Sequence, residues 1–115
     1  MNRYSPRRQS RRWLDGDCPR GVLAIYYDKR EPADAYTVFF AQPVVSDGTY
    51  AGTAIEYAGI SENGVGFHGE LSAYETAQFR FRNAHRACKW TDLPEAVRNW
   101  VTADLKFTEE WQNAH

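Results

Sequence analysis

Apolar and aromatic residues gather in short runs along the first half of the chain. Residues 21–28 (GVLAIYYD) and 35–42 (AYTVFFAQ) are rich in β-branched and aromatic side chains, and a charged segment with a proline separates them. This pattern predicts two strands of a hairpin. Residues 50–57 (YAGTAIEY) follow a Ser-Asp-Gly turn and predict a third strand. Pro43 is expected to interrupt pairing before that turn.

The segment 59–70 contains four glycines. Its Asn63-Gly64 pair predicts a chain reversal, because both residue types tolerate positive φ. Residues 71–78 fit two interpretations and are treated as an open connection. Ser72 and Glu75 are spaced for a helix capping box, while the phenylalanines at 79 and 81 alternate with arginines as in a strand.

Residues 86–90 (RACKW) alternate polar and apolar side chains and predict a last strand. The clearest periodic pattern follows it. Leu93, Val97, Trp100, Val101 and Leu105 recur at spacings of three and four, which predicts an amphipathic helix.

Residues near position 92 supply the start signals for this helix. Asp92 is expected to cap it, with Glu95 as the capping-box partner and Pro94 in the first turn. We therefore expect a helix from about Asp92 to Leu105 across one face of a sheet.

A chain of 115 residues is long enough for one domain. The elements together predict the α+β class: a mostly antiparallel sheet of about four strands with one C-terminal amphipathic helix packed on a face. Residues 1–20 are expected to form a flexible basic arm, and residues 21–115 the domain.

Charge is divided unevenly between these two parts. Residues 1–20 contain six arginines and two aspartates, a sum of +4, so the remainder carries −5 of the total of −1. The arm has two functional interpretations. Arg7, Arg8, Arg11 and Arg12 could bind nucleic-acid phosphates without sequence preference, or the arm, with Trp13, could dock on an acidic protein or on a second copy in a homodimer.

A second group of cations lies in the segment FRFRNAHR. Arg80, Arg82 and Arg86 are interleaved with phenylalanines, a composition that suits base stacking and phosphate contacts. The same alternation arises where a sheet covers a core, so it does not by itself indicate a binding strand.

Four side chains of the kind that zinc prefers are present: Cys18, His68, His85 and Cys88. Only His85 and Cys88 are closely spaced, so we expect no bound metal and no cofactor. A cysteine nucleophile with a histidine base has no support from spacing, which argues against an enzyme.

Two further patterns surround the glycine-rich turn. Glu56, Glu62, Glu70 and Glu75 could supply an acid–base pair or a divalent-cation site, although their spacing matches no calcium loop. The glycines at 64, 66 and 69 have G-x-G-x-x-G spacing, yet the parallel α/β context of a dinucleotide site is absent. A small-nucleotide pocket there remains an alternative.

Four segments, GVLAIY, YTVFF, GVGFHGE and WTDLPEAV, occur in this order between Gly21 and Val97. In this arrangement the chain resembles small accessory proteins of tailed bacteriophages and prophages. The resemblance covers roughly residues 11–105. It implies a phage origin and action in the cytoplasm of the bacterial host, but no catalytic residues.

Seventeen aromatic residues are more than the core of a small domain requires. We expect several to form an exposed interface on the sheet, with candidates Trp13, Tyr26, Tyr36, Tyr50 and Tyr57. The hypothesis is a non-catalytic accessory protein that binds a host or phage protein through this surface and the arm. A nucleic-acid-binding role is the alternative, and no apolar run is long enough to predict a membrane span.

Overall fold

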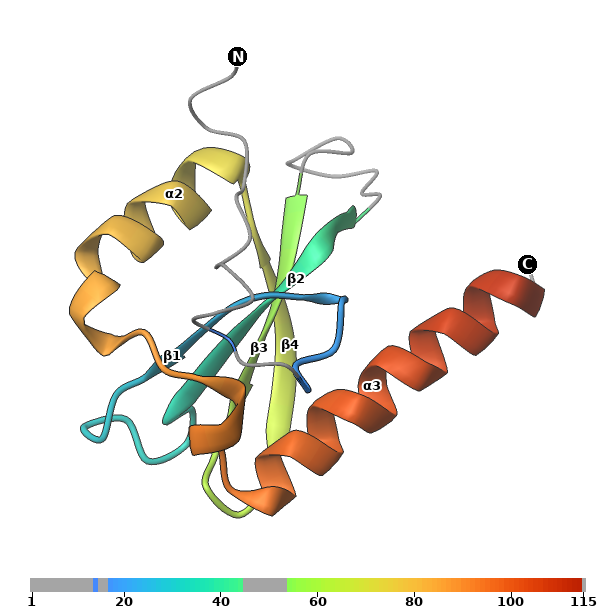
Figure 1. Ribbon diagram of the computed structural model, residues 1–115. Helices are drawn as coiled ribbons and strands as arrows, with labels where there is room; N and C mark the ends of the chain where they lie inside the picture. Colours follow the sequence, from blue (N-terminus) through green and yellow to red (C-terminus); the bar gives the residue numbers. More distant parts are fainter. Residues whose placement is uncertain (1–13, 15–16, 45–53, 115) are drawn as a thin grey trace.

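Four strands form one antiparallel sheet in the computed structural model, which describes residue 14, residues 17–44 and residues 54–114 (Figure 1). The strands are β1 (Val22–Tyr27), β2 (Tyr36–Val44), β3 (Ala54–Ile60) and β4 (Gly66–Leu71). They are adjacent in chain order. The α+β class predicted from the sequence is confirmed.

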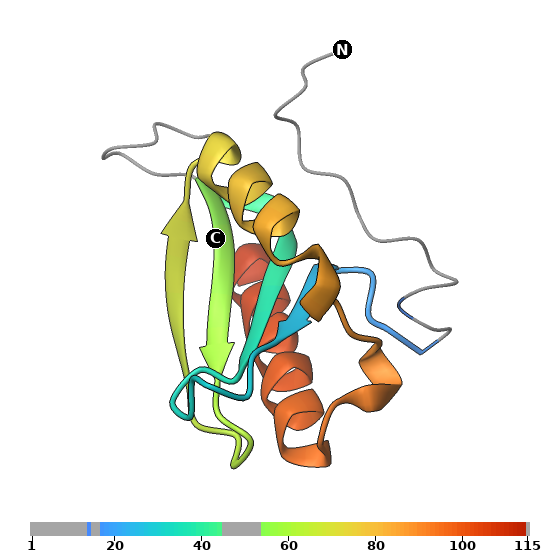
Figure 2. The same ribbon diagram turned by 90° about the vertical axis from the view of Figure 1, so that its left-hand side faces the viewer.

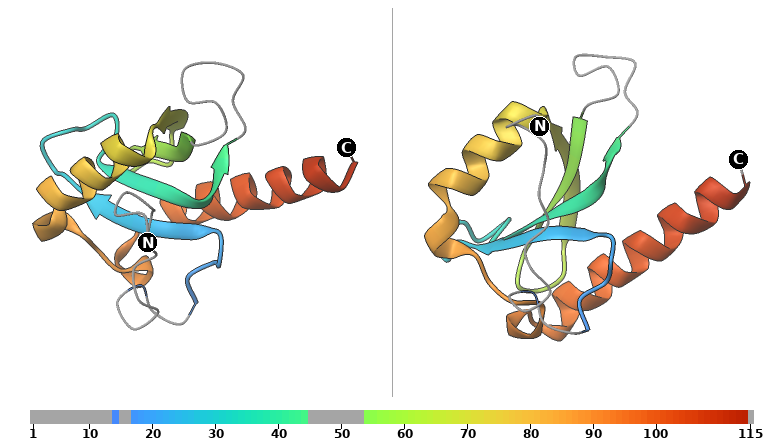
Figure 3. Two further views of the ribbon diagram at one scale, coloured as in Figure 1. Left: turned by 90° about the horizontal axis from the view of Figure 1, so that it is seen from above. Right: turned by 45° about the horizontal axis from the view of Figure 1, so that its top comes forward.

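The sheet lies between two helices. α2 (Ala73–Arg82) covers one face and α3 (Glu95–Ala114) crosses the other, as Figure 2 shows. Two short 3-10 turns, η1 (Ala84–Arg86) and η2 (Trp90–Asp92), connect the helices. The last turns of α3 extend beyond the strands (Figure 3). The sequence predicted α3 but not α2.

α2 begins at a complete capping box. The Ser72 hydroxyl accepts a bond from the Glu75 backbone at 3.0 Å, and the Glu75 carboxylate accepts one from the Ser72 backbone at 3.2 Å. These two bonds satisfy donors that a helix start leaves unpaired. The strand interpretation of residues 79–82 is therefore wrong, because local capping favours a helix over the alternation.

The start of α3 also differs from the prediction. Asp92 does not cap α3, since its carboxylate accepts from the Lys89 backbone at 3.1 Å and closes η2. The Pro94 carbonyl instead accepts the first bonds of α3, from Val97 and Arg98. The helix begins at Glu95 and runs to Ala114, nine residues past the predicted end at Leu105.

One core fills the space between the sheet and α3. The apolar stripe predicted for the C-terminal helix faces this core, with Val97 and Val101 fully buried. Leu14 and Cys18 belong to the same core, at 0% and 6% exposed. The packed domain thus reaches back before the boundary expected at Gly21, because these two apolar side chains cover the sheet.

A second core lies under α2. Phe79 of the helix contacts Tyr26 and Phe39 of the strands, with ring centroids 5.4 and 5.2 Å apart. α2 therefore covers the part of this sheet face around Tyr26 and Phe39, whereas Phe67 on β4 is 46% exposed. Tyr26 and Tyr36 are 5% and 7% exposed, so neither belongs to an aromatic docking surface. The expectation for Trp13 and Tyr50 lies outside the described residues.

Two strand predictions need correction. Pro43 does not end the pairing of β2, because it lies opposite Ile55 beyond an irregularity in the register. Residues 86–90 are not a strand. Only an isolated bridge joins Ala87 to Tyr26, and the Cys88 backbone N–H donates to the Ile25 carbonyl at 3.0 Å. This segment lies along the outer edge of β1, and β4 forms the opposite edge of the sheet.

Glycines in and before β4 allow close packing. Gly64 has φ of 83°, which confirms the predicted turn. A Cβ on Gly66 would lie 2.6 Å from the ring of Trp100, and one on Gly69 would lie 2.5 Å from the ring of Tyr57. β4 was missed in the sequence because glycine weakens a strand pattern, whereas here the aromatic rings occupy the missing side-chain space.

Candidate metal centre

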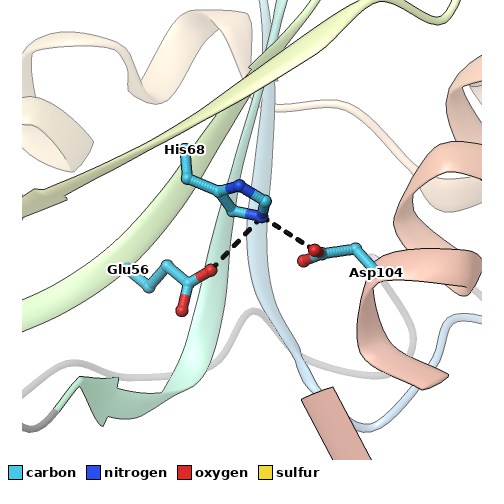
Figure 4. Close-up of side chains that lie close together, drawn as sticks. All are labelled: Glu56, His68 and Asp104. Carbon is cyan, nitrogen blue, oxygen red and sulfur yellow. Dashed lines mark hydrogen bonds and ion pairs between the residues drawn. The ribbon is translucent and has the colours of Figure 1, made fainter. Parts of the chain in front are cut away.

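Three chemically reactive side chains meet between the sheet and α3. Glu56 lies on β3 and His68 on β4, and the register pairs Glu56 with Glu70 and Ala58 with His68. Side chains two positions apart share a sheet face, so Glu56 and His68 are diagonal neighbours on the face that α3 crosses. Asp104 reaches them from α3 (Figure 4).

His68 Nε2 is the centre of this group. It lies 2.8 Å from Asp104 Oδ1 and 3.5 Å from Glu56 Oε1. One ligand atom from each residue lies within 4.8 Å of the other two. Ligands at about 2.1 Å from a tetrahedral ion are about 3.4 Å apart. The His68–Glu56 separation of 3.5 Å fits this value, whereas the 2.8 Å between His68 and Asp104 is a hydrogen-bond distance that would have to lengthen around an ion.

Packing fixes the side chains around this point. The Trp100 ring lies against His68 with a centroid distance of 5.1 Å, and Gly66 leaves room for that ring. Asp104 follows Trp100 by one helical turn, so the two side chains project from the same side of α3. The aromatic contact therefore helps to set the position of the helix that carries Asp104.

The electrostatic environment is acidic. Burial raises the pKa of Glu56, and His68 opposes this shift while Asp104 and Glu70 add to it. Two carboxylates share one imidazole, so the cluster has a net negative charge whenever both carboxylates are ionised. An added cation would reduce the repulsion between the carboxylates.

The donor set is one imidazole nitrogen and two carboxylate oxygens, which suits zinc, manganese or ferrous iron. The side chain of His68 is 48% exposed, that of Glu56 29% and that of Asp104 14%. The cluster is thus reachable from solvent on the histidine side, where water could complete the coordination of a bound ion.

The four side chains weighed as zinc ligands in the sequence do not form one group among the described residues. Glu56, His68 and Asp104 form the group of metal-binding side chains found among the described residues, and neither cysteine belongs to it. Burial raises the pKa of Cys88 to about 12, so this thiol is protonated at neutral pH. Cys88 is therefore poorly suited to metal binding or nucleophilic attack.

The carboxylates around the glycine-rich turn separate into different roles. Glu56 enters the cluster, whereas Glu62 accepts a bond from the Tyr27 hydroxyl at 3.1 Å and Glu75 closes the α2 capping box. Glu70 is exposed on β4. The small-nucleotide pocket that was kept as an alternative at the glycines is not supported, because rings fill the space beside Gly66 and Gly69.

The predicted arginines lie on a helix and a turn. Arg80 donates to the Tyr26 hydroxyl at 3.2 Å, and Arg86 donates to Asn83 Oδ1 at 2.7 Å. Arg82 is exposed at the end of α2. These three side chains do not share a strand face. Four further predicted contacts lie outside the described residues: Arg7, Arg8, Arg11 and Arg12.

Asp104 is the residue that the sequence reasoning missed. It lies 36 positions from His68, and no motif joins the two. One sequence signal could have placed two of the three ligands together. A strand over residues 66–71 would put His68 and Glu70 on one sheet face, with Glu56 on the neighbouring strand. The direction in which α3 crosses that face supplies the third ligand.

Comparison of the chain with protein families, curated proteins and solved structures finds no match. The resemblance to phage accessory proteins therefore stays a prediction from the sequence. In the described part of the chain, no helix combines the length and apolar character needed to cross a membrane.

Proposed function

We propose that this protein binds one divalent transition-metal ion through Glu56, His68 and Asp104. The observation that carries the proposal is the convergence of one nitrogen and two oxygen ligands from β3, β4 and α3 within 4.8 Å. Three protein ligands with a solvent-facing side leave room for a water molecule on the ion.

A simple ion pair is the competing explanation for the cluster. An imidazolium could donate to either carboxylate, but Nε2 has only one proton, and it lies within 3.5 Å of both Glu56 and Asp104. A metal ion can attract all three ligand atoms at once. Because zinc and nickel bind nitrogen more strongly than magnesium does, the site should prefer them over magnesium.

The first test is calorimetric titration of the chelator-treated full chain with zinc, manganese and magnesium salts. We expect about one zinc or manganese ion per chain, with magnesium at least tenfold weaker. His68→Gln and Asp104→Asn should each weaken zinc binding by at least tenfold. His85→Gln is the matched control, since it removes an exposed imidazole outside the cluster.

Two results would overturn the proposal: no zinc binding by the unsubstituted chain at millimolar metal, or equal zinc affinity in the chain and in its His68→Gln variant. A pH series adds a further check. Zinc affinity should fall as the solution is made acidic, because protons compete with the metal for the ligand atoms.

A macromolecular partner remains a second proposal, as expected for a phage-type accessory protein. The observation that favours it is the exposure of Phe81 on α2 and Phe107 on α3, at 86% and 66%. A contiguous exposed apolar patch often marks a contact, and Tyr74, 49% exposed, lies seven positions before Phe81 on the same side of α2. Phe81→Ser should release a partner captured on the immobilised chain, while Val65→Ser, which alters a loop side chain, should not.

A further inference from the structure

Cations from two separate segments line an open groove beside β1, away from the metal cluster. The groove has a volume of about 500 Å³ and lies between the residues after β1 and the residues of and after η1. Its lining consists of Tyr27, Asp28, Lys29, Arg30, His85, Arg86, Ala87 and Cys88.

The floor of the groove is fixed and uncharged. Ala87 forms a bridge with Tyr26, and the Cys88 N–H donates to the Ile25 carbonyl, so this segment is held along the edge of β1. Burial raises the pKa of the Cys88 thiol to about 12. The floor therefore carries no thiolate that would neutralise the surrounding cations.

One carboxylate orders two guanidinium groups on the rim. Asp28 accepts two bonds from the Arg30 side chain, both at 3.0 Å, and lies 3.5 Å from Arg86 Nη1. Arg86 is also held by Asn83. Guanidinium groups that are already ordered lose less entropy when they bind an anion.

The rim has a surplus of positive charge. Lys29 is exposed and makes no ion pair with any residue that the structure describes. Among the lining residues, Lys29, Arg30 and Arg86 outnumber one carboxylate, that of Asp28, and His85 adds a further donor. Glu31 near Arg30 and Glu62 at the Tyr27 hydroxyl lie outside the lining and reduce this local surplus. A phosphomonoester carries nearly two negative charges at neutral pH and can pair with the lining cations.

We infer that the groove binds a phosphomonoester with a flat, largely apolar organic part, the chemistry of a nucleoside monophosphate. The phosphate would contact Lys29 and Arg86, while the flat part would lie on Tyr27, Ala87 and Cys88. The volume falls within the range of about 300–1,000 Å³ that is usual for small-ligand sites. This chemistry occurs in a free mononucleotide and at the 5′-phosphorylated end of a nucleic-acid strand.

The experiment compares matched probes by calorimetry and by amide chemical shifts of the full chain. Adenosine monophosphate should bind at least tenfold more tightly than adenosine or inorganic phosphate. A short DNA strand with a 5′-phosphate should be compared with the same strand bearing a 5′-hydroxyl. Preference for the free nucleotide or for the phosphorylated strand identifies the source of the ligand.

Lys29→Gln should weaken phosphate-dependent binding by about three- to tenfold, because it removes an exposed cation and leaves the core unchanged. Lys106→Gln, an exposed lysine on α3, is the matched control. The inference is overturned if neither phosphorylated probe binds at millimolar concentration, or if their unphosphorylated counterparts bind with equal affinity. It is also overturned if inorganic phosphate binds as tightly as the two phosphorylated probes. An unchanged affinity for these probes in Lys29→Gln would overturn it as well. Loss of zinc binding in His68→Gln leaves this site intact, so the two proposals fail independently.

Discussion

Replacement of Gly66 by alanine tests how β4 and α3 fit together. The new methyl group would lie 2.6 to 2.8 Å from three atoms of the Trp100 ring. The Trp100 ring lies between two packed layers, so it can make room only if α3 moves or the side chain adopts another rotamer. Such overpacking destabilises by about 1–3 kcal/mol. Alanine also reduces the conformational freedom of the unfolded chain, which stabilises the protein by about 0.4–1 kcal/mol. We therefore expect the free energy of unfolding to fall by about 1–2 kcal/mol in total.

Urea unfolding followed by tryptophan fluorescence and circular dichroism measures this loss. Gly69→Ala is the matched control, because its methyl group meets the Tyr57 ring on the opposite sheet face at 2.5 Å. Both variants should lose stability. Only Gly66→Ala should also weaken zinc binding, since Trp100 contacts His68 and precedes Asp104 by one turn.

A double-mutant cycle assigns the loss to the ring. In a Trp100→Ala background, Gly66→Ala should cost at least about 1 kcal/mol less than in the unsubstituted chain, because the clashing atoms are gone. An equal cost in both backgrounds would refute the argument. So would a Gly66→Ala protein as stable as the parent.

Three other predictions follow from burial and ionisation. Phe39→Ala should destabilise by about 3–5 kcal/mol because the ring is fully buried, whereas Phe81→Ala, at an exposed site, should change stability by less than about 0.5 kcal/mol in urea unfolding. Burial raises the pKa of Glu56, so the metal-free folded state holds this proton more tightly than the unfolded chain. Stability should therefore fall as pH rises from the usual glutamate pKa through the raised value, and Glu56→Gln should flatten that part of a pH–stability curve. Because the pKa of Cys88 is about 12, its thiolate fraction at pH 8 is about 10⁻⁴. A disulfide-exchange reagent should therefore label Cys88 much faster in urea than in buffer. Rapid labelling of Cys88 in the native protein would contradict this prediction.

Local signals predicted those parts of the fold that short-range physics decides. The spacing from Leu93 to Leu105 identified α3, and Asn63-Gly64 identified the turn before β4. β4 itself was not predicted, because its glycines suit a strand only when distant rings from Tyr57 and Trp100 pack over them. Such long-range packing has no local pattern.

The segment from Ser72 to Arg82 shows how two correct local signals can conflict. The capping-box spacing indicates a helix, and the alternation of phenylalanine with arginine indicates a strand. In the structure Phe79 enters the core under α2, while Phe81 is exposed. Side chains two positions apart point to different sides of a helix, so one of them can be buried and the other exposed. The same error placed Tyr26 on an open sheet face, whereas Phe79 of α2 packs against it.

The candidate metal centre could be predicted only in part from the sequence. Glu56 and His68 were separate candidates for different chemistry, and only strand register joins them. The position of Asp104 depends on the angle at which α3 crosses the sheet, which in turn depends on Trp100 against Gly66. Sequence spacing contains no measure of that angle.

The two edges of the sheet differ in a way that limits self-association. Along β1, backbone groups are engaged by Ala87 and Cys88, whereas within the described residues no strand pairs with the outer side of β4. Within the described residues, edge-to-edge pairing between copies is therefore favoured where one β4 meets another. Two copies related by a two-fold axis would share a continuous eight-stranded sheet whose outer strands are both β1, and Ala87 and Cys88 cover part of each of these edges, which disfavours further growth.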